Sequence, residues 1–145
     1  MNALRQILVV EDNAADLELT LEALRASRLA NPLDVARDGA EALDYLFCRG
    51  ACAGRVTGDP LFVLLDLKMP KVDGLEVLRT VKGDERLRRI PIVMLTSSRQ
   101  ETDLVKSYQL GVNAYVVKPV EFAEFVGAVR DLGTFWALLN EPPPA

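Results

Sequence analysis

The sequence contains no histidine and only two cysteines, and these shortages exclude several kinds of chemistry. Without histidine the chain has no Ser-His or Cys-His catalytic pair, no histidine metal ligand and no phosphohistidine of its own. Two cysteines, Cys48 and Cys52, are too few for a disulfide framework. Such a low cysteine count is typical of proteins of the reducing cytoplasm. We therefore expect a cytoplasmic protein whose chemistry rests on carboxylate, hydroxyl and amine groups.

Long apolar runs and a surplus of basic residues are also missing. No stretch reaches the roughly 18 apolar residues that a transmembrane helix needs. Residues 1–6 lack the basic start and apolar core of a secretory signal. The formal net charge is −4, whereas nucleic-acid binding usually requires a basic face. We expect neither a membrane nor a nucleic acid as a partner.

The length of 145 residues suits one folded domain. Half of the residues are hydrophobic and 26% are charged, which argues against disorder. We expect one domain over residues 1–140 and a proline-rich tail over residues 141–145. On this interpretation no output domain follows.

Short apolar runs alternate with helical patterns along the chain. Unbroken branched apolar runs are typical of strands covered on both faces, and right-handed crossovers place helices on both sides of a parallel sheet. The sequence therefore predicts an α/β fold with a doubly wound, five-stranded parallel sheet built as (βα)5. The expected strands are Ile7–Val10, Leu33–Arg37, Phe62–Leu65, Ile92–Leu95 and Ala114–Val117. The expected helices cover about 15–29, 40–47, 75–81, 100–110 and the residues from 121 onward.

Candidate site residues follow directly on the first, third, fourth and fifth expected strands. Ligands of open parallel sheets bind at the carboxyl ends of the strands, so these side chains should converge. Three close carboxylates call for a hard cation, and Mg²⁺ takes such oxygens together with a phosphate. A strand-end aspartate can also attack a phosphoryl group as a nucleophile. The residues are Glu11 and Asp12, Asp66, Thr96, and Lys118.

Two of the aspartates have a plain structural alternative. An aspartate that follows a strand is often only the N-cap of the next helix. For Asp12 a capping role and a functional role are equally well supported. For Asp73, which precedes Gly74, a capping role is the better supported of the two.

Five segments together resemble the receiver domains of two-component response regulators, and they span almost the whole chain. The resemblance implies the flavodoxin-like strand order 2-1-3-4-5. It also implies a signalling phosphoacceptor that acts only on its own phosphoryl group and is not a general enzyme. The segments are Ile7–Asp12, Leu64–Pro70, Asp73-Gly74, Val93–Ser97 and Ala114–Pro119.

The resemblance also implies a role for each matching residue. Asp66 would accept the phosphoryl group, and Thr96 and Lys118 would contact it. Tyr115 would be the aromatic residue that moves with Thr96 in the switch. The Lys118–Pro119 peptide bond is expected to be cis, which is cheap only before proline. The ligands expected for Mg²⁺ are Glu11 through water, Asp12, Asp66 and the backbone carbonyl of Lys68.

A narrower similarity points to the single-domain regulators that partner phytochrome histidine kinases. It rests on the long loop over 49–60, on Leu67–Lys71, on Arg89–Pro91 and on Phe135-Trp136. It implies a sensor histidine kinase of the phytochrome type as phosphoryl donor, and thus a role in light signalling.

The expected last helix carries more apolar residues than one face can bury, and exposed apolar patches usually mark interfaces. We expect a symmetric homodimer through this region, with Phe125, Val129, Phe135 and Trp136 as candidate contacts. In the alternative, Phe135 and Trp136 fold back on their own domain.

Three competing functions remain at this point. A phosphatase with a strand-end aspartate nucleophile wants a second aspartate two residues later, where this chain has Lys68. A receiver-like protein that only binds partners is a second alternative. A receiver excised from a longer regulator or a hybrid kinase is the third.

Overall fold

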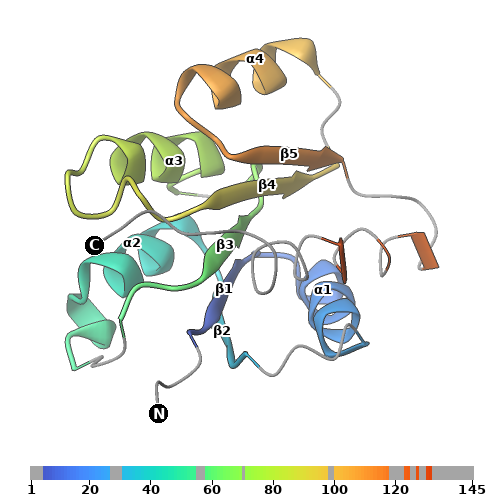
Figure 1. Cartoon of the computed structure of the whole chain (residues 1–145), viewed down its shortest axis with the longest axis horizontal. Helices are drawn as coiled ribbons and strands as arrows, with labels where there is room; N and C mark the ends of the chain where they lie inside the picture. The colour runs from blue at the N-terminus through green and yellow to red at the C-terminus, as the bar shows by residue number, and fades with distance from the viewer. Residues whose placement is uncertain are drawn as a thin grey trace.

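The computed structural model describes residues 5–26, 31–54, 58–69, 71–97, 100–117, 123–124, 127 and 130–131. Five parallel strands form one sheet in the order β2-β1-β3-β4-β5, as the resemblance implied (Figure 1). The strands are β1 (Ile7–Val10), β2 (Leu33–Ala36), β3 (Phe62–Leu65), β4 (Ile92–Thr96) and β5 (Ala114–Val117). The helices are α1 (Ala14–Ala26), α2 (Gly39–Phe47), α3 (Gly74–Lys82) and α4 (Glu101–Gln109). A short 3₁₀ helix, η1 (Gly50–Cys52), interrupts the segment that was expected to be a plain loop.

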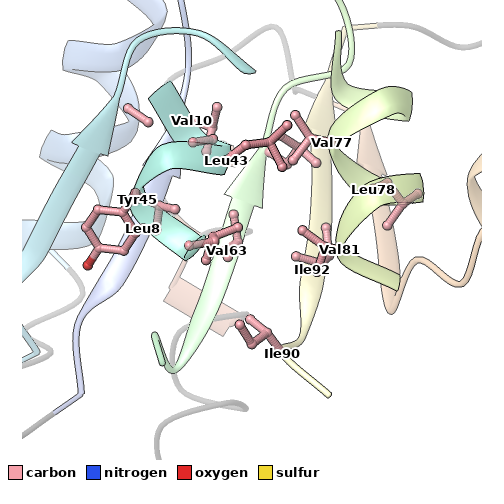
Figure 2. Packing of buried hydrophobic residues seen from close by; sticks show 14 of the residues in the cluster. Leu8, Val10, Leu43, Tyr45, Val63, Val77, Leu78, Val81, Ile90 and Ile92 are labelled. Carbon is pink, nitrogen blue, oxygen red and sulfur yellow. The ribbon is translucent and has the colours of Figure 1, made fainter. Parts of the chain in front are cut away.

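Successive strand residues point to opposite faces of the sheet, and each face has its own apolar cluster. On one face Ile7 and Val9 of β1 pack with Leu17, Leu21 and Leu24 of α1. On the other face β1, β3 and β4 pack against α2 and α3 (Figure 2). The sheet is therefore covered on both sides, which explains why its three central strands are apolar without alternation. The cluster of Figure 2 includes Leu8, Val10, Leu43, Val63, Val77, Leu78, Val81 and Ile92.

Aspartate and asparagine side chains cap three of the helices. Asp38 accepts a hydrogen bond from the Glu41 amide at the start of α2, and Asp73 caps α3 in the same way, as expected. At α1 the cap is Asn13, whose Oδ1 accepts from the Asp16 amide at 2.9 Å. The alternative that made Asp12 the cap is therefore wrong, because the helix begins one residue later.

Lys82 forms hydrogen bonds at the amino-terminal ends of the strands, on the edge of the sheet opposite the candidate site. Its Nζ donates to the carbonyls of Arg88 and Ile90 at 3.0 and 2.9 Å, and to Oδ1 of Asn113 at 3.0 Å. One ammonium thus joins the end of α3 to the chain segments that lead into β4 and β5. Burial lowers the pKa of Lys82 to about 8, because the charged form loses solvation.

Helix α4 differs from the other helices in the polarity of its two faces. Its buried side chains include Asp103 and Ser107, whereas Leu104, Val105 and Tyr108 are exposed. The helix ends where predicted, and Gly111 follows it with φ of +96°, a conformation that glycine adopts without strain. Neither apolar cluster of the described residues takes a residue from α4 itself.

Most of the region of the expected last helix lies outside the described residues. Residues 123–124, 127 and 130–131 are helical. The candidate dimer contacts Phe125, Val129, Phe135 and Trp136 are not among them, and neither is the tail over 141–145. Within the described ranges, every helix is too short or too polar to pass through a bilayer.

Candidate functional site

The carboxyl ends of β1, β3 and β4 bring the predicted polar residues to one edge of the sheet. Val10 is paired in register with Leu65, so the next residues, Glu11 and Asp66, stand level on adjacent strands. Thr96 is the last residue of β4, the next strand in the sheet. The edge position predicted from the sequence is therefore correct for Glu11, Asp66 and Thr96.

Three carboxylates form the centre of this site. Glu11, Asp12 and Asp66 each offer an oxygen, and the three oxygens lie within 4.8 Å of one another. Glu11 and Asp66 are buried, whereas Asp12 is exposed. Three negative charges at this separation repel one another strongly unless a cation lies among them. Hard oxygen donors in this number suit Mg²⁺ or a similar divalent cation.

Backbone contacts hold Asp66 in place. Its amide donates to the Val10 carbonyl at 3.1 Å, and its Oδ1 accepts from the Leu67 amide at 2.9 Å. The second of these hydrogen bonds sets the rotation of the carboxylate. Gly74 packs directly on this backbone, since a Cβ there would collide with the Asp66 carbonyl oxygen and lie 2.8 Å from Leu67 Cα.

The loop between β3 and α3 has a second close contact of the same kind. A Cβ on Gly39, the first residue of α2, would collide with the Val72 carbonyl oxygen. Each glycine follows a capping aspartate, so Asp38-Gly39 and Asp73-Gly74 bring two helix N-termini against one loop. We call residues 66–73 the acceptor loop, and its two ends are set by contacts where only glycine fits.

Two lysines of the acceptor loop pair with aspartates of two different helices. Lys68 Nζ lies 3.4 Å from an oxygen of Asp103 in α4. Lys71 Nζ lies 4.0 Å from Asp38, the cap of α2. Sequence reasoning missed Asp103, although a signal was present. Asp103 and Ser107 are four residues apart and therefore lie on the same face of α4.

Thr96 and Tyr115 differ in burial. Thr96 is 1% exposed, and Tyr115 is partly buried against the apolar cluster of α2 and α3. Tyr115 is paired with Met94 across β4 and β5, two residues before Thr96 on β4. Both side chains therefore occupy the strand β4–β5 side of the site. Lys118 and the Lys118–Pro119 peptide bond lie outside the described residues, so their predicted roles stay predictions.

Fold, acidic cluster and strand-end hydroxyl together define a receiver domain. The family model of the response regulator receiver domain matches residues 7–130. The chain therefore belongs to the response regulator receiver family and is a phosphorelay signalling switch.

Several relatives are phytochrome response regulators. The bacteriophytochrome response regulator AtBRR is 68% identical, with a TM-score of 0.79 over 97% of this chain and 100% of its own. The phosphorylated cyanobacterial phytochrome response regulator RcpA is 39% identical, with a TM-score of 0.90 over 98% and 100%.

Rcp1 of Synechocystis sp. is 38% identical over 135 residues, which are 93% of this chain and 90% of Rcp1. Its Mn²⁺-bound crystal structure has a TM-score of 0.87 at 37% identity, covering 97% of this chain and 99% of that one. The chain is thus similar to the phytochrome subgroup in sequence and in fold, and the matches cover nearly the whole of each chain.

Proposed function

We propose that Asp66 accepts a phosphoryl group from a partner histidine kinase and that the modified domain signals by a change of shape. The observation that carries this proposal is the set of three carboxylate oxygens within 4.8 Å, with a buried threonine at the end of the next strand. Such a set suits a divalent cation and a phosphoryl group together, because Mg²⁺ prefers carboxylates combined with phosphate oxygens.

The residues present fit Mg²⁺ by their chemistry. Asp12, Asp66 and the Lys68 carbonyl would hold it directly, and Glu11 would act through water. Bound Mg²⁺ neutralises charge on the carboxylates and on the phosphoryl oxygens. The manganese in the Rcp1 structure supports a divalent cation in relatives of this chain.

The chain's own residues then carry the transfer. A carboxylate oxygen of Asp66 forms a bond to phosphorus while the bond between phosphorus and the donor nitrogen breaks. The donor must be another protein, because this chain has no histidine. The Thr96 hydroxyl donates a hydrogen bond to one phosphoryl oxygen, and the Lys118 ammonium forms an ion pair with another.

The conformational response uses the β4–β5 side of the site. When Thr96 moves toward the phosphoryl group, it leaves space that Tyr115 fills. Tyr115 already packs against the apolar cluster of α2 and α3, so its ring starts this movement from a partly buried position. A local change in charge thereby biases an element with two arrangements.

Phosphoryl labelling of Asp66→Asn tests the acceptor. Wild-type protein treated with acetyl phosphate and Mg²⁺ should gain one phosphoryl group by intact-mass spectrometry, whereas Asp66→Asn should gain none. Asp44→Asn is the control, because Asp44 lies on α2 away from the acidic cluster and should label normally. Full labelling of Asp66→Asn would show that another residue is the acceptor.

The donor that we propose is a histidine kinase of the phytochrome type. The support is the 68% identity to AtBRR and the similarity to RcpA and Rcp1. An autophosphorylated phytochrome kinase should transfer its phosphoryl group to this chain much faster than a kinase with an unrelated sensor does. Equal rates from both kinases would remove the phytochrome assignment and leave the receiver assignment standing.

We further propose a symmetric homodimer through the last helix. The support is the apolar content of residues 121–139, including Phe125, Val129, Phe135 and Trp136. Solution mass measured with Mg²⁺, before and after addition of beryllofluoride, tests this. A dimer in either state supports the interface, and a monomer at micromolar concentration in both states contradicts it.

The phosphatase alternative is disfavoured by Lys68. That class places a general-acid aspartate two residues after its nucleophile. A lysine ammonium is a much weaker acid than a carboxyl group, so it protonates a leaving group poorly. On our proposal the protein turns over only its own phosphoryl group. Sustained hydrolysis of p-nitrophenyl phosphate that depends on Asp66 would revive the alternative.

A further inference from the structure

Helix α4 contributes no residue to either apolar cluster of the described residues, unlike α1, α2 and α3. Its inner face carries a carboxylate, that of Asp103, and the fully buried hydroxyl of Ser107. The Ser107 Oγ has no hydrogen-bond partner among the described residues. Its outer face exposes Leu104, Val105 and Tyr108, so apolar surface lies where solvent is. The hydrophobic effect therefore contributes little to holding this helix in place.

An ion pair between α4 and the acceptor loop helps to hold the helix in place where apolar packing is sparse. Lys68 Nζ lies 3.4 Å from Asp103, whose side chain is 10% exposed, while that of Lys68 is 66% exposed. The buried carboxylate is costly to leave without a cation. The lysine, in contrast, is largely hydrated and free to exchange partners. Lys68 is also only two residues from Asp66.

We propose that the Lys68–Asp103 ion pair is a latch that holds α4 against the acceptor loop, and that phosphorylation of Asp66 releases it. The release step rests on the proposed function of Asp66. The latch itself rests on the contact between Lys68 and Asp103 alone.

The phosphoryl group opens the latch by competition for the lysine. It adds up to about two negative charges and three strong acceptor oxygens beside the start of the acceptor loop. Lys68 turns toward these oxygens, and Asp103 loses a cationic partner. A buried carboxylate is then less well compensated on the inner face of α4, and the helix shifts to expose it to water. The same shift brings Leu104 and Val105 toward new neighbours.

Hydrogen exchange of the unphosphorylated protein tests the latch. Lys68→Met and Asp103→Asn should each speed exchange of the α4 amides by about two- to fivefold, which matches the contribution of one partly exposed ion pair. Combining them should add little, because both remove the same contact. Lys68→Arg keeps the charge and should restore slow exchange. Amides of α3 serve as the internal reference.

Lys71→Met is the matched control. Lys71 belongs to the same loop and also pairs with a helix aspartate, Asp38, but on α2. This variant should leave α4 exchange at the wild-type rate. Wild-type rates in both Lys68→Met and Asp103→Asn would overturn the latch. Equal acceleration by Lys71→Met would overturn it too, because the effect would then belong to loop charge in general.

Beryllofluoride with Mg²⁺ tests the release step on wild-type protein. We expect slower exchange in the acceptor loop and faster exchange in α4, with no further gain in α4 for Lys68→Met. A response of the acceptor loop without one in α4 would overturn the release step alone. No response in either segment would overturn the release step together with the proposed function of Asp66.

Discussion

Replacing Asp12 by asparagine should make the cation-free protein more stable, although it removes a site residue. The reason is the crowding of charge at the strand ends, where the oxygens of Glu11, Asp12 and Asp66 lie within 4.8 Å. Asparagine keeps the shape of the side chain and removes one of the three charges. Two of the three mutual repulsions disappear with it.

The size of the effect follows from the distance and from the exposure of Asp12. Two unit charges about 4 Å apart repel by about 1 kcal/mol in water and by about 4 kcal/mol at the effective dielectric constant of a protein surface. Asp12 is exposed, so solvent screens both of its repulsions toward the lower figure. We expect the free energy of unfolding to rise by about 1 to 2 kcal/mol.

Urea unfolding in EDTA measures the stability of the cation-free protein, and urea unfolding in excess MgCl₂ measures the stability gained from the cation. Wild-type protein should gain stability from Mg²⁺, because a ligand that binds only the folded state stabilises it. Asp12→Asn should be more stable than wild type in EDTA and should gain much less from Mg²⁺. Glu22→Gln, the same kind of change at an exposed position of α1, is the control and should alter neither value.

Two results would refute the reasoning in different places. An Asp12→Asn variant less stable than wild type in EDTA would mean that the three carboxylates do not repel in the folded state. A variant that gains as much as wild type from Mg²⁺ would remove Asp12 from the set of ligands.

Two further predictions concern the frame around the site. Lys82→Met removes three hydrogen bonds and should lower the free energy of unfolding at pH 7 by about 1 to 3 kcal/mol, measured by urea titration. Burial lowers the folded-state pKa of Lys82 to about 8 from 10.5, so the unfolded chain binds more protons between these pH values. The stability difference between wild type and this variant should therefore grow as pH rises from 8 toward 10.5, and a difference that shrinks would contradict the direction of the shift. Gly74→Ala should cost about 1 to 3 kcal/mol and slow phosphoryl uptake by Asp66, because its Cβ would lie 2.8 Å from Leu67 Cα. Gly54→Ala, where nothing lies within 4 Å of the added carbon, is the control, and equal losses in both variants would show that the close contact is not the cause.

The strands and the strand-end residues could be predicted because one physical pattern specifies them. A branched apolar run that ends in a polar residue is both a buried strand and an exit at the sheet edge, so Ile7–Val10 and Phe62–Leu65 were predicted with the bounds that the structure has. The convergence of Glu11, Asp12 and Asp66 then follows from the parallel direction of the strands alone.

The details that escaped prediction depend on choices between neighbours that propensity does not separate. Asp12 and Asn13 are both good caps, and only the starting residue of α1 decides between them. For α4, the usual rule places Leu104 and Val105 inside, whereas the structure places Asp103 and Ser107 there. Periodicity finds such a helix, but it does not show that the face with Asp103 turns inward, where Lys68 of the acceptor loop pairs with it.

The two aspartate–glycine pairs that bracket the acceptor loop have a consequence for how this protein can be altered. The ends of the loop are positioned by main-chain contacts at Gly39 and Gly74, which do not depend on the side chains between them. Exposed side chains of the loop can therefore be varied while Asp66 keeps its place, but Lys71 has φ of +65° and its position suits only residues that tolerate a left-handed backbone. Changes to the loop surface are therefore compatible with the chemistry of Asp66, provided that both glycines are kept.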